Sequence, residues 1–261
     1  MISIIKIPFD ACIVEKERRG AAKGPEAIEA ELKNFFKFDE LKVKPEFVEI
    51  KEKNDFDKMH KEVEKKADEE YKNKSFVIGL GGDHSVSYGL MKAFAKNHKN
   101  AGLIYFDAHL DCQDDFLPPT HEDVLRAAVK EKLFKKIFVY GIRNYTEKEK
   151  KFAMENFSWD SAEVPIKSAE KHIFEELLKE VDSLYISIDI DAIDPAFAPG
   201  TGWPEPLGML PQDFINLLRK IIATKKVKGI DIVEVSPPKD VNNMTAKLAA
   251  RLLLEFLNSK A

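Results

Sequence analysis

The chain has little cysteine and no long apolar run, and both deficits narrow its possible classes. Among 261 residues only Cys12 and Cys112 are cysteines. Two cysteines are too few for a disulfide framework, so a reducing, cytoplasmic compartment is expected. No run approaches the roughly 18 apolar residues that cross a membrane, and the first residues are typical of a strand rather than of an export signal. No membrane association is expected.

An excess of positive charge is also lacking. The 41 lysines and arginines stand against 45 acidic residues, which gives a formal net charge of -4 at pH 7. Such a chain has no global basic field, so nucleic acid is not an expected partner. Gly/Ser-rich linkers and internal repeats are absent as well, and 44% of the residues are hydrophobic, enough for a sizeable core. We therefore expect one domain over residues 1–261.

Apolar runs of strand length alternate with amphipathic helical stretches. Strands are expected at Ile2–Pro8, Glu46–Ile50, Ser75–Leu80, Gly102–Asp107, Lys136–Gly141, Leu184–Asp189 and Gly229–Val235, with a weaker one near Ala162–Ile166. Helices are expected at Pro25–Phe36, Phe56–Asn73, Val86–Asn97, Glu122–Phe134, Glu147–Phe157, Ala169–Val181, Pro211–Lys225 and Met244–Ser259. Single helices between strands indicate βαβ units. The expected fold class is α/β, a three-layer α/β/α domain with a mostly parallel, roughly eight-stranded sheet.

Three of the expected strands end in carboxylates and imidazoles. In a parallel sheet the carboxyl ends of the strands meet at one edge, where ligands bind, and alternate strand residues face the same way. A single Asp-x-Asp run is usually a pair of solvated loop acids, but three ligand-bearing runs at three strand ends favour one shared polar site. The residues that we expect there are His84, Asp107, His109, Asp111, Asp189 and Asp191.

This donor set indicates a metal site. Carboxylates and imidazoles without a thiolate suit Mn²⁺, Mg²⁺ or Zn²⁺, and the mixture favours Mn²⁺ or Zn²⁺. Six ligands are too many for one tetrahedral ion, and four carboxylates at one point would repel one another. Two ions that share bridging carboxylates account for the number of ligands, and such a pair can lower the pKa of a water between them.

The same motifs resemble those of the ureohydrolases, the family of arginase, agmatinase and formiminoglutamase. The segments after Pro8 and Gly24 and the segment from Asp231 to Pro238 resemble other parts of that family, so the resemblance spans nearly the whole chain. The motifs that carry it are Gly81-Gly82-Asp83-His84-Ser85, Asp107-Ala108-His109 with Asp111, Ser187 with Asp189 and Asp191, and Asp194-Pro195 with Ala198-Pro199-Gly200-Thr201-Gly202.

The resemblance implies an arginase-like fold and two Mn²⁺ per chain. One ion would be held by His84, Asp107, Asp111 and Asp189, and the other by Asp107, His109, Asp189 and Asp191. Asp107 and Asp189 would therefore bridge the two ions. A homo-oligomer, either a trimer or a hexamer, is also implied.

The implied reaction is the hydrolysis of a linear guanidino compound to urea and an amine, with Asp111, His121 and Glu234 as catalytic residues. Glu234 would bind the substrate guanidinium through paired, charge-assisted hydrogen bonds. His121 would carry a proton to the leaving amine, because an imidazole titrates near neutral pH. The plain alternatives are a helix-capping or exposed glutamate and a solvent-facing histidine at the start of a helix.

The expected substrate is a small cationic guanidino compound, agmatine first. Arginases bind an amino acid head group partly through an Asn at the position of Gln113, and the loop 141–147 lacks the early acids that such enzymes use. Arginine, guanidinobutyrate, guanidinopropionate and formiminoglutamate stay as alternatives. Further substrate contacts are expected from Asn144, Trp203 and Glu122, although Trp203 is equally explained by a subunit contact. The acids Asp114, Asp115, Glu122 and Asp123 are expected to attract a cation at the pocket mouth.

Two positions depart from the family pattern. Glu122 stands where the family has glycine, and it is expected either to narrow the pocket or to pair with His121 and raise its pKa. Leu207 replaces a glycine in the loop after Pro206. The Glu122 change keeps open an alternative of a different class, a metal-stabilised paralogue without catalytic activity. Of the other histidines, His60, His98 and His172 are expected at the surface.

Overall fold

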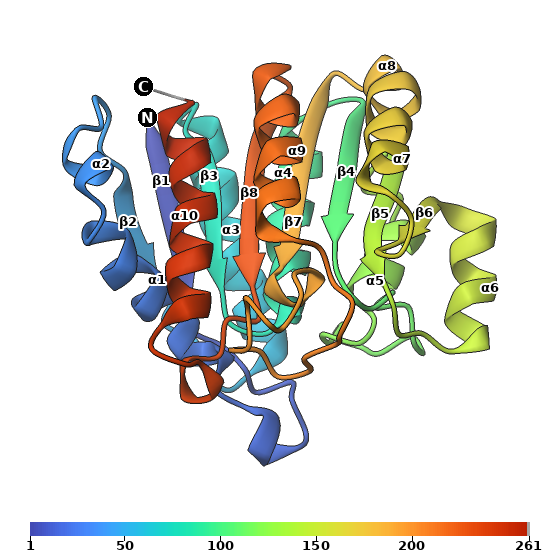
Figure 1. Ribbon diagram of the computed structural model, residues 1–261, viewed down its shortest axis with the longest axis horizontal. Coiled ribbons are helices and arrows are strands. Elements are labelled where there is room, and N and C mark those ends of the chain that lie inside the picture. The colour runs from blue at the N-terminus through green and yellow to red at the C-terminus, as the bar shows by residue number, and fades with distance from the viewer. Residues whose placement is uncertain (260–261) are drawn as a thin grey trace.

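The computed structural model describes residues 1–259 and contains one eight-stranded sheet in which every pair of neighbouring strands is parallel (Figure 1). The strands lie side by side in the order β2-β1-β3-β8-β7-β4-β5-β6. Their bounds are β1 Ile2–Ile7, β2 Glu46–Glu49, β3 Phe76–Gly81, β4 Ala101–Phe106, β5 Lys136–Ile142, β6 Ser158–Ser161, β7 Ser183–Asp189 and β8 Val227–Val233. The central strands are buried along almost their whole length, as expected for a parallel sheet with two covered faces.

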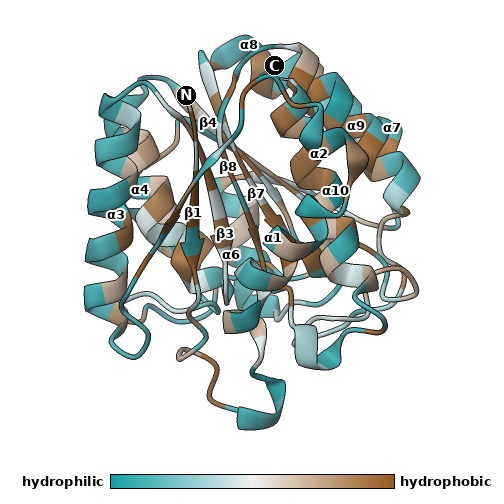
Figure 2. Cartoon of the chain, turned by 90° about the vertical axis from the view of Figure 1, so that its left-hand side faces the viewer, coloured by the Kyte–Doolittle hydropathy of each residue, from teal (hydrophilic) through white to brown (hydrophobic). Residues whose placement is uncertain are grey.

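Helices cover both faces of the sheet and confirm the predicted three layers (Figure 2). One layer packs through a core that includes Ile28, Phe214 and Leu253, and the other through a core that includes Val63, Phe94 and Leu125. The first layer contains α1 Gly24–Lys33, α7 Ile166–Lys171, α8 Leu178–Glu180, α9 Pro211–Ala223 and α10 Met244–Asn258; the second contains α3 Phe56–Lys72, α4 Ser87–Asn97 and α5 Val124–Lys130. The short α2 Phe36–Asp39 and the helix α6 Glu147–Asn156 lie toward the two edges of the sheet. None of the described helices combines the length and apolarity that crossing a bilayer requires.

Three sequence predictions were wrong in detail. The weak strand near Ala162–Ile166 is instead β6 at Ser158–Ser161, because the residues after Ser161 form a turn and Pro165 is the N-cap of α7. The helix expected from Glu122 begins at Val124. The residues before it form a turn around Asp123, which accepts hydrogen bonds from the backbone N–H groups of Phe116 at 2.9 Å and Thr120 at 2.7 Å.

His60 was the third error, because it is buried and not on the surface. It lies on the inner side of α3, only 5% exposed, with its ring edge-on to Tyr88. Its Nε2 donates to the carbonyl oxygen of Pro119 over 2.9 Å. His60 is spaced at helical intervals from the buried Val63 and Ala67, so it belongs to the inner face of α3 although Lys61 and Glu62 follow it.

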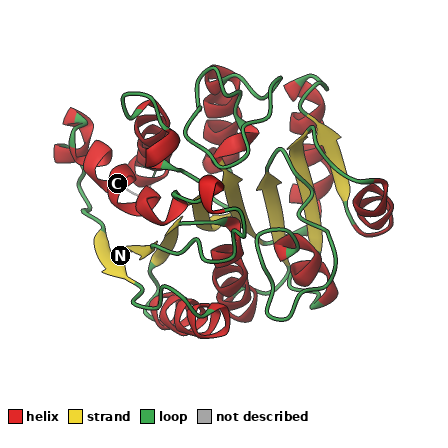
Figure 3. Cartoon of the chain, turned by 90° about the horizontal axis from the view of Figure 1, so that it is seen from below, coloured by secondary structure: helices red, strands yellow, loops and turns green. Residues whose placement is uncertain are grey.

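The carboxyl ends of all eight strands lie at one edge of the sheet, at the bottom of Figure 1. Seen from below, the connecting loops gather over the ends of the central strands (Figure 3). The neighbours β3, β8, β7 and β4 are the strands that carry the polar motifs, so adjacency in the sheet brings those motifs together. Gly82 permits the close passage of the chain beyond β3, because a Cβ there would lie 1.7 Å from the carbonyl oxygen of Phe9.

Candidate metal centre

All six predicted ligands lie at the carboxyl ends of three strands. His84 begins a short helical turn after β3, Asp107 directly follows β4, and His109 and Asp111 continue that chain. Asp189 is the last residue of β7, and Asp191 lies in the turn that follows. Asp107, Asp189, Asp191 and His84 are buried, whereas His109 and Asp111 are partly exposed toward a cavity.

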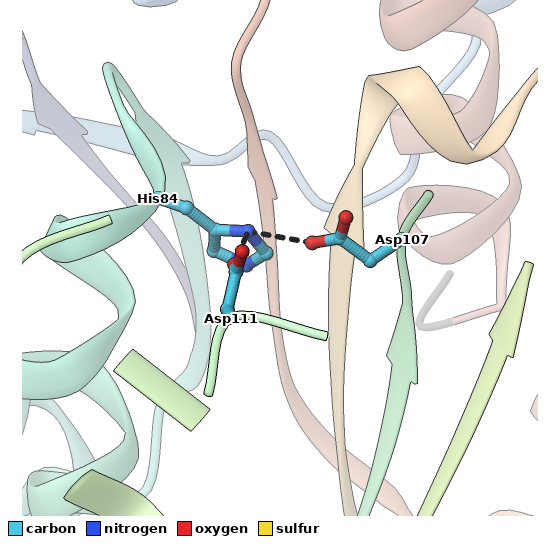
Figure 4. Close-up of side chains that lie close together, drawn as sticks. All are labelled: His84, Asp107 and Asp111. Carbon is cyan, nitrogen blue, oxygen red and sulfur yellow. Dashed lines mark ion pairs between the residues drawn. The ribbon is translucent and has the colours of Figure 1, made fainter. Parts of the chain in front are cut away.

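One group of ligands converges on the ring of His84. Its Nδ1 lies 3.0 Å from Asp107 Oδ2 and 3.2 Å from Asp111 Oδ2 (Figure 4). The same nitrogen lies 3.2 Å from Asp189 Oδ2. The side chain of Asp111 is also fixed by Tyr105, whose hydroxyl donates to Asp111 Oδ2 over 2.6 Å. Ligand atoms of His84, Asp107 and Asp111 lie within 4.8 Å of one another, the spacing of a first metal site.

A second group converges on His109. Its Nδ1 lies 3.0 Å from Asp191 Oδ2 and 3.5 Å from Asp107 Oδ1. Asp107 thus belongs to both groups, with Oδ2 toward His84 and Oδ1 toward His109. That is the arrangement of a carboxylate able to bridge two ions. Asp189 lies beside the first group through its Oδ2, while its Oδ1 accepts from the backbone N–H of Asp191 over 2.8 Å.

The charges of this cluster fit two divalent cations. Four carboxylates face only two imidazoles, and no lysine or arginine lines the adjoining cavity within the described chain. With protein charges alone, burial and the neighbouring carboxylates of Asp111 and Asp191 raise the pKa of Asp107 to about 6. Burial works against a charge on His84, yet its carboxylate neighbours raise its pKa well above the ordinary value. An oxygen-rich, negatively charged and buried donor set of this kind suits Mn²⁺ or Zn²⁺.

A hydrogen-bonded chain behind His84 orients its ring. Ser187 on β7 donates its hydroxyl proton to Asp231 Oδ1 over 2.7 Å, and its Oγ lies 2.9 Å from His84 Nε2. Because that proton goes to Asp231, His84 Nε2 must donate to Ser187, which leaves Nδ1 facing the carboxylates. Tyr105 stacks flat on the His84 ring at 4.6 Å and 1°.

The orientation of His84 by Ser187 and Asp231 through hydrogen bonds was not predicted from the sequence. The sequence does contain a signal for it, because polar residues interrupt otherwise apolar strands. Tyr185 in β7 also donates to Asp231, over 2.7 Å. Tyr185, Ser187 and Asp231 are all buried in the middle of the sheet, where polar groups require partners.

A cavity of about 270 Å³ opens onto the ligands. Glu234 lies at its inner end, 4% exposed, directly after β8 and with a left-handed φ of 61°. Its Oε1 accepts from the backbone N–H of His84 over 2.9 Å, whereas its Oε2 is buried without a hydrogen-bond partner among the described residues. Thr201 Oγ1 is unpartnered in the same way and also lines the cavity. These two free oxygens can accept hydrogen bonds from a donor-rich ligand.

The other residues predicted for substrate contact also line the cavity. The rings of His121 and Trp203 lie 5.3 Å apart at 31°, so Trp203 forms a wall of the pocket. Burial lowers the pKa of His121, which favours its neutral form. Asn144 donates to Glu205 Oε1 over 2.7 Å, and the same Glu205 oxygen lies 3.5 Å from His109 Nε2.

The predicted acidic mouth is only partly correct. Asp114 pairs with Lys148, and Asp115 pairs with Arg126 and Lys130. Asp123 is buried within its own loop. Glu122 lines the cavity but forms no ion pair with His121, so the expected rise in the pKa of His121 was wrong.

Sequence reasoning missed two acidic residues that line the cavity, Glu15 and Glu149. Glu149 is occupied as the partner of Thr146 in a capping box at the start of α6. The Thr-x-x-Glu pattern was the signal for that role. Glu15 lies in the irregular segment after β1, and no sequence pattern indicated its place.

Comparisons with known proteins agree with this geometry. A model of the arginase family matches residues 1–258. The chain is 37% identical over 196 residues to the mitochondrial guanidino acid hydrolase of Homo sapiens, covering 69% of this chain and 53% of that protein. It is 36% identical over 192 residues to the mitochondrial agmatinase of Gallus gallus, covering 69% and 55%. The chain thus matches about half the length of these two relatives.

A solved structure supports the same relationship. The agmatine ureohydrolase of Thermoplasma volcanium superimposes with a TM-score of 0.86 and 29% identity, covering 99% of this chain and 89% of that one. The family match over nearly the whole sequence, the shared fold and the clustered ligand motifs lead to one conclusion: the chain belongs to the arginase family, a family of C–N hydrolases.

Proposed function

We propose that this chain hydrolyses a linear guanidino compound to urea and an amine, and that its preferred substrate is a guanidino amine such as agmatine. The observation that carries the proposal is the charge of the cavity. Among the described residues its acidic and basic lining consists of carboxylates and histidines, without a lysine or arginine. A cation with many N–H donors complements such a lining.

Two Mn²⁺ per chain complete the proposed site. His84, Asp107, Asp111 and Asp189 would hold one ion, and Asp107, His109, Asp189 and Asp191 the other. The bridging role of Asp107 is supported by the division of its two oxygens between His84 and His109. When bound, the ions supply a water of lowered pKa as the nucleophile and stabilise negative charge beside it.

The protein side chains bind the substrate and move its protons. Glu234 accepts guanidinium N–H groups through its free Oε2, which directs the planar group toward the ligand cluster. Asp111 accepts a hydrogen bond from Tyr105 and is held next to His84, where it orients the attacking water. Burial lowers the pKa of His121, which favours its neutral form, and its Nδ1 has no partner among the described residues. It can therefore take up a proton and deliver it to the leaving amine.

The alternative substrates carry a negative group that this cavity does not match. Guanidinobutyrate, guanidinopropionate and formiminoglutamate each need a donor or a cation for a carboxylate. Arg18 lies beside the cavity wall, but its guanidinium lies over the Trp203 ring at 5.0 Å and donates to the carbonyl oxygen of Gly202. The human relative is named a guanidino acid hydrolase. Turnover of agmatine must therefore be compared with turnover of these guanidino acids and of arginine.

The test is urea release from a guanidine panel by Mn²⁺-loaded and chelator-treated protein. We expect turnover of agmatine only in the loaded form, with guanidinobutyrate and arginine slower by at least about tenfold. Faster turnover of a guanidino acid would overturn the substrate assignment. Absence of turnover by fully loaded protein would favour the non-catalytic paralogue. The implied trimer or hexamer is measured on the same sample by light scattering.

A further inference from the structure

Glu15 and Glu122 differ from the other acids around the cavity because they have no partner. Neither side chain forms a hydrogen bond or ion pair with any residue between 1 and 259, although both line the cavity and both are exposed. The neighbouring acids Asp114 and Asp115 are neutralised by Lys148, Arg126 and Lys130. The two unpaired carboxylates therefore leave a negative charge at the outer end of the cavity.

The two carboxylates line the same cavity. Partial desolvation beside the cavity wall raises the pKa of Glu122, and the charge of Glu15 is the next largest cause of that rise. They come from segments that are far apart in the sequence, one after β1 and the other before α5. A ligand placed between them would meet both.

The segment that carries Glu15 is fixed to the cavity wall. Asp10 accepts from the backbone N–H groups of Gly20 at 2.9 Å and Ala22 at 3.2 Å. Arg19 Nε donates to the carbonyl oxygen of Ile13 over 2.7 Å, and Arg18 donates to that of Gly202 over 3.2 Å. These contacts hold the segment from both sides of Glu15, which lets a single exposed side chain act as a positioned ligand group.

The inner end of the same cavity gives independent evidence of a ligand. Glu234 is 96% buried, since it is 4% exposed, and its Oε2 has no partner. A buried, unpartnered carboxylate oxygen calls for a donor from outside the described chain. The cavity therefore has one carboxylate for a cation at its inner end and two more at its outer end.

We propose that Glu15 and Glu122 form a clamp for the ammonium group at the far end of a guanidino amine. The clamp selects a cationic tail over a neutral or an anionic one, and it gives Glu122 a function at a position where the family has glycine. This inference rests on the proposed function, since it assumes that the guanidinium end lies at Glu234. It adds the residues that bind the ammonium end of the substrate.

The test compares three guanidines that differ only in the tail: agmatine, butylguanidine and guanidinobutyrate. Mn²⁺-loaded full-length protein should have a kcat/KM for agmatine that exceeds that for butylguanidine by about 10- to 100-fold, the effect of a charge-assisted contact. In the E15Q/E122Q double variant this ratio should fall to within about threefold. The matched control is E17Q, on the same segment but outside the cavity lining, which should keep the wild-type ratio.

An unchanged ratio in the double variant would overturn the clamp while leaving guanidine hydrolysis intact. If the wild type turned over none of the three guanidines, the proposed function would fail, and calorimetry with putrescine would then decide on the clamp. The clamp predicts at least about tenfold weaker putrescine binding in the double variant than in E17Q. Equal binding by the two variants, or no binding by the wild type, would refute it.

Discussion

Replacement of Ser187 by alanine tests how the protein prepares His84 to bind a metal. The Ser187 hydroxyl links His84 Nε2 at 2.9 Å to Asp231 at 2.7 Å, and it is fully buried. The alanine variant leaves a ring N–H and a carboxylate oxygen without partners. A buried polar group in that state costs about 1–3 kcal/mol, so the two together should lower the free energy of unfolding by about 2–6 kcal/mol.

The effect on metal affinity can be estimated from the same contacts. Loss of a residue that orients a metal ligand weakens binding by about 10- to 100-fold. The lower end applies here, because Tyr105 still stacks flat on the His84 ring and keeps its plane. We therefore expect about tenfold weaker binding of Mn²⁺, equivalent to about 1.4 kcal/mol, in calorimetric titrations of metal-depleted protein.

Ser183 provides a matched control on the same strand. It lies four residues earlier and faces the same side of β7, it is buried, and its Oγ has no hydrogen-bond partner among the described residues. Its replacement by alanine should leave Mn²⁺ affinity within about twofold of the wild type. Unchanged affinity in the Ser187 variant, or an equal loss in both variants, would refute the orienting role.

Three further predictions concern the catalytic histidine, the backbone and a buried histidine. His121→Ala should lower kcat for agmatine by about 100-fold or more with metal content unchanged by mass spectrometry; lost metal would make His121 a ligand. Leu207 has a left-handed φ of 64°, so Leu207→Gly should raise the free energy of unfolding by up to about 1 kcal/mol in a denaturant titration. Leu210 has an ordinary φ of -73°, so the control Leu210→Gly should lower the free energy of unfolding in the same titration. Burial lowers the pKa of His60 in the folded protein. Below about pH 6.5 the unfolded chain therefore binds a proton at His60 more readily than the folded chain does. Stability should fall as pH drops from about 7.5 to 5.5, and His60→Gln should reduce that slope; an identical slope would contradict it.

The sheet, and the meeting of the six candidate ligands at one edge of it, could be predicted from the sequence because both depend on local patterns. Apolar runs of strand length reveal buried parallel strands, and ligands after strand ends must meet at one edge of such a sheet. Asp107, His109 and Asp111 are close neighbours in the chain, and adjacency of β4 and β7 then brings Asp189 and Asp191 to them.

The outer pocket could not be predicted in the same way. Glu15 reaches the cavity through an irregular segment fixed by Asp10, Arg18 and Arg19, and those contacts join residues without any periodic spacing. The four acids of the pocket mouth looked equivalent in the sequence. Their pairing with lysine and arginine, which removes Asp114 and Asp115 from consideration, depends on tertiary contacts alone.

Metal content of the Asp107 variant tests the central claim most directly. Asp107 is the residue that joins the two ligand groups, with one carboxylate oxygen toward His84 and the other toward His109. Mass spectrometry of Mn²⁺-loaded, desalted protein should find two ions per chain in the wild type and neither in Asp107→Ala, whose fold is checked by circular dichroism. Retention of both ions by a folded Asp107→Ala would contradict the bridged two-metal centre.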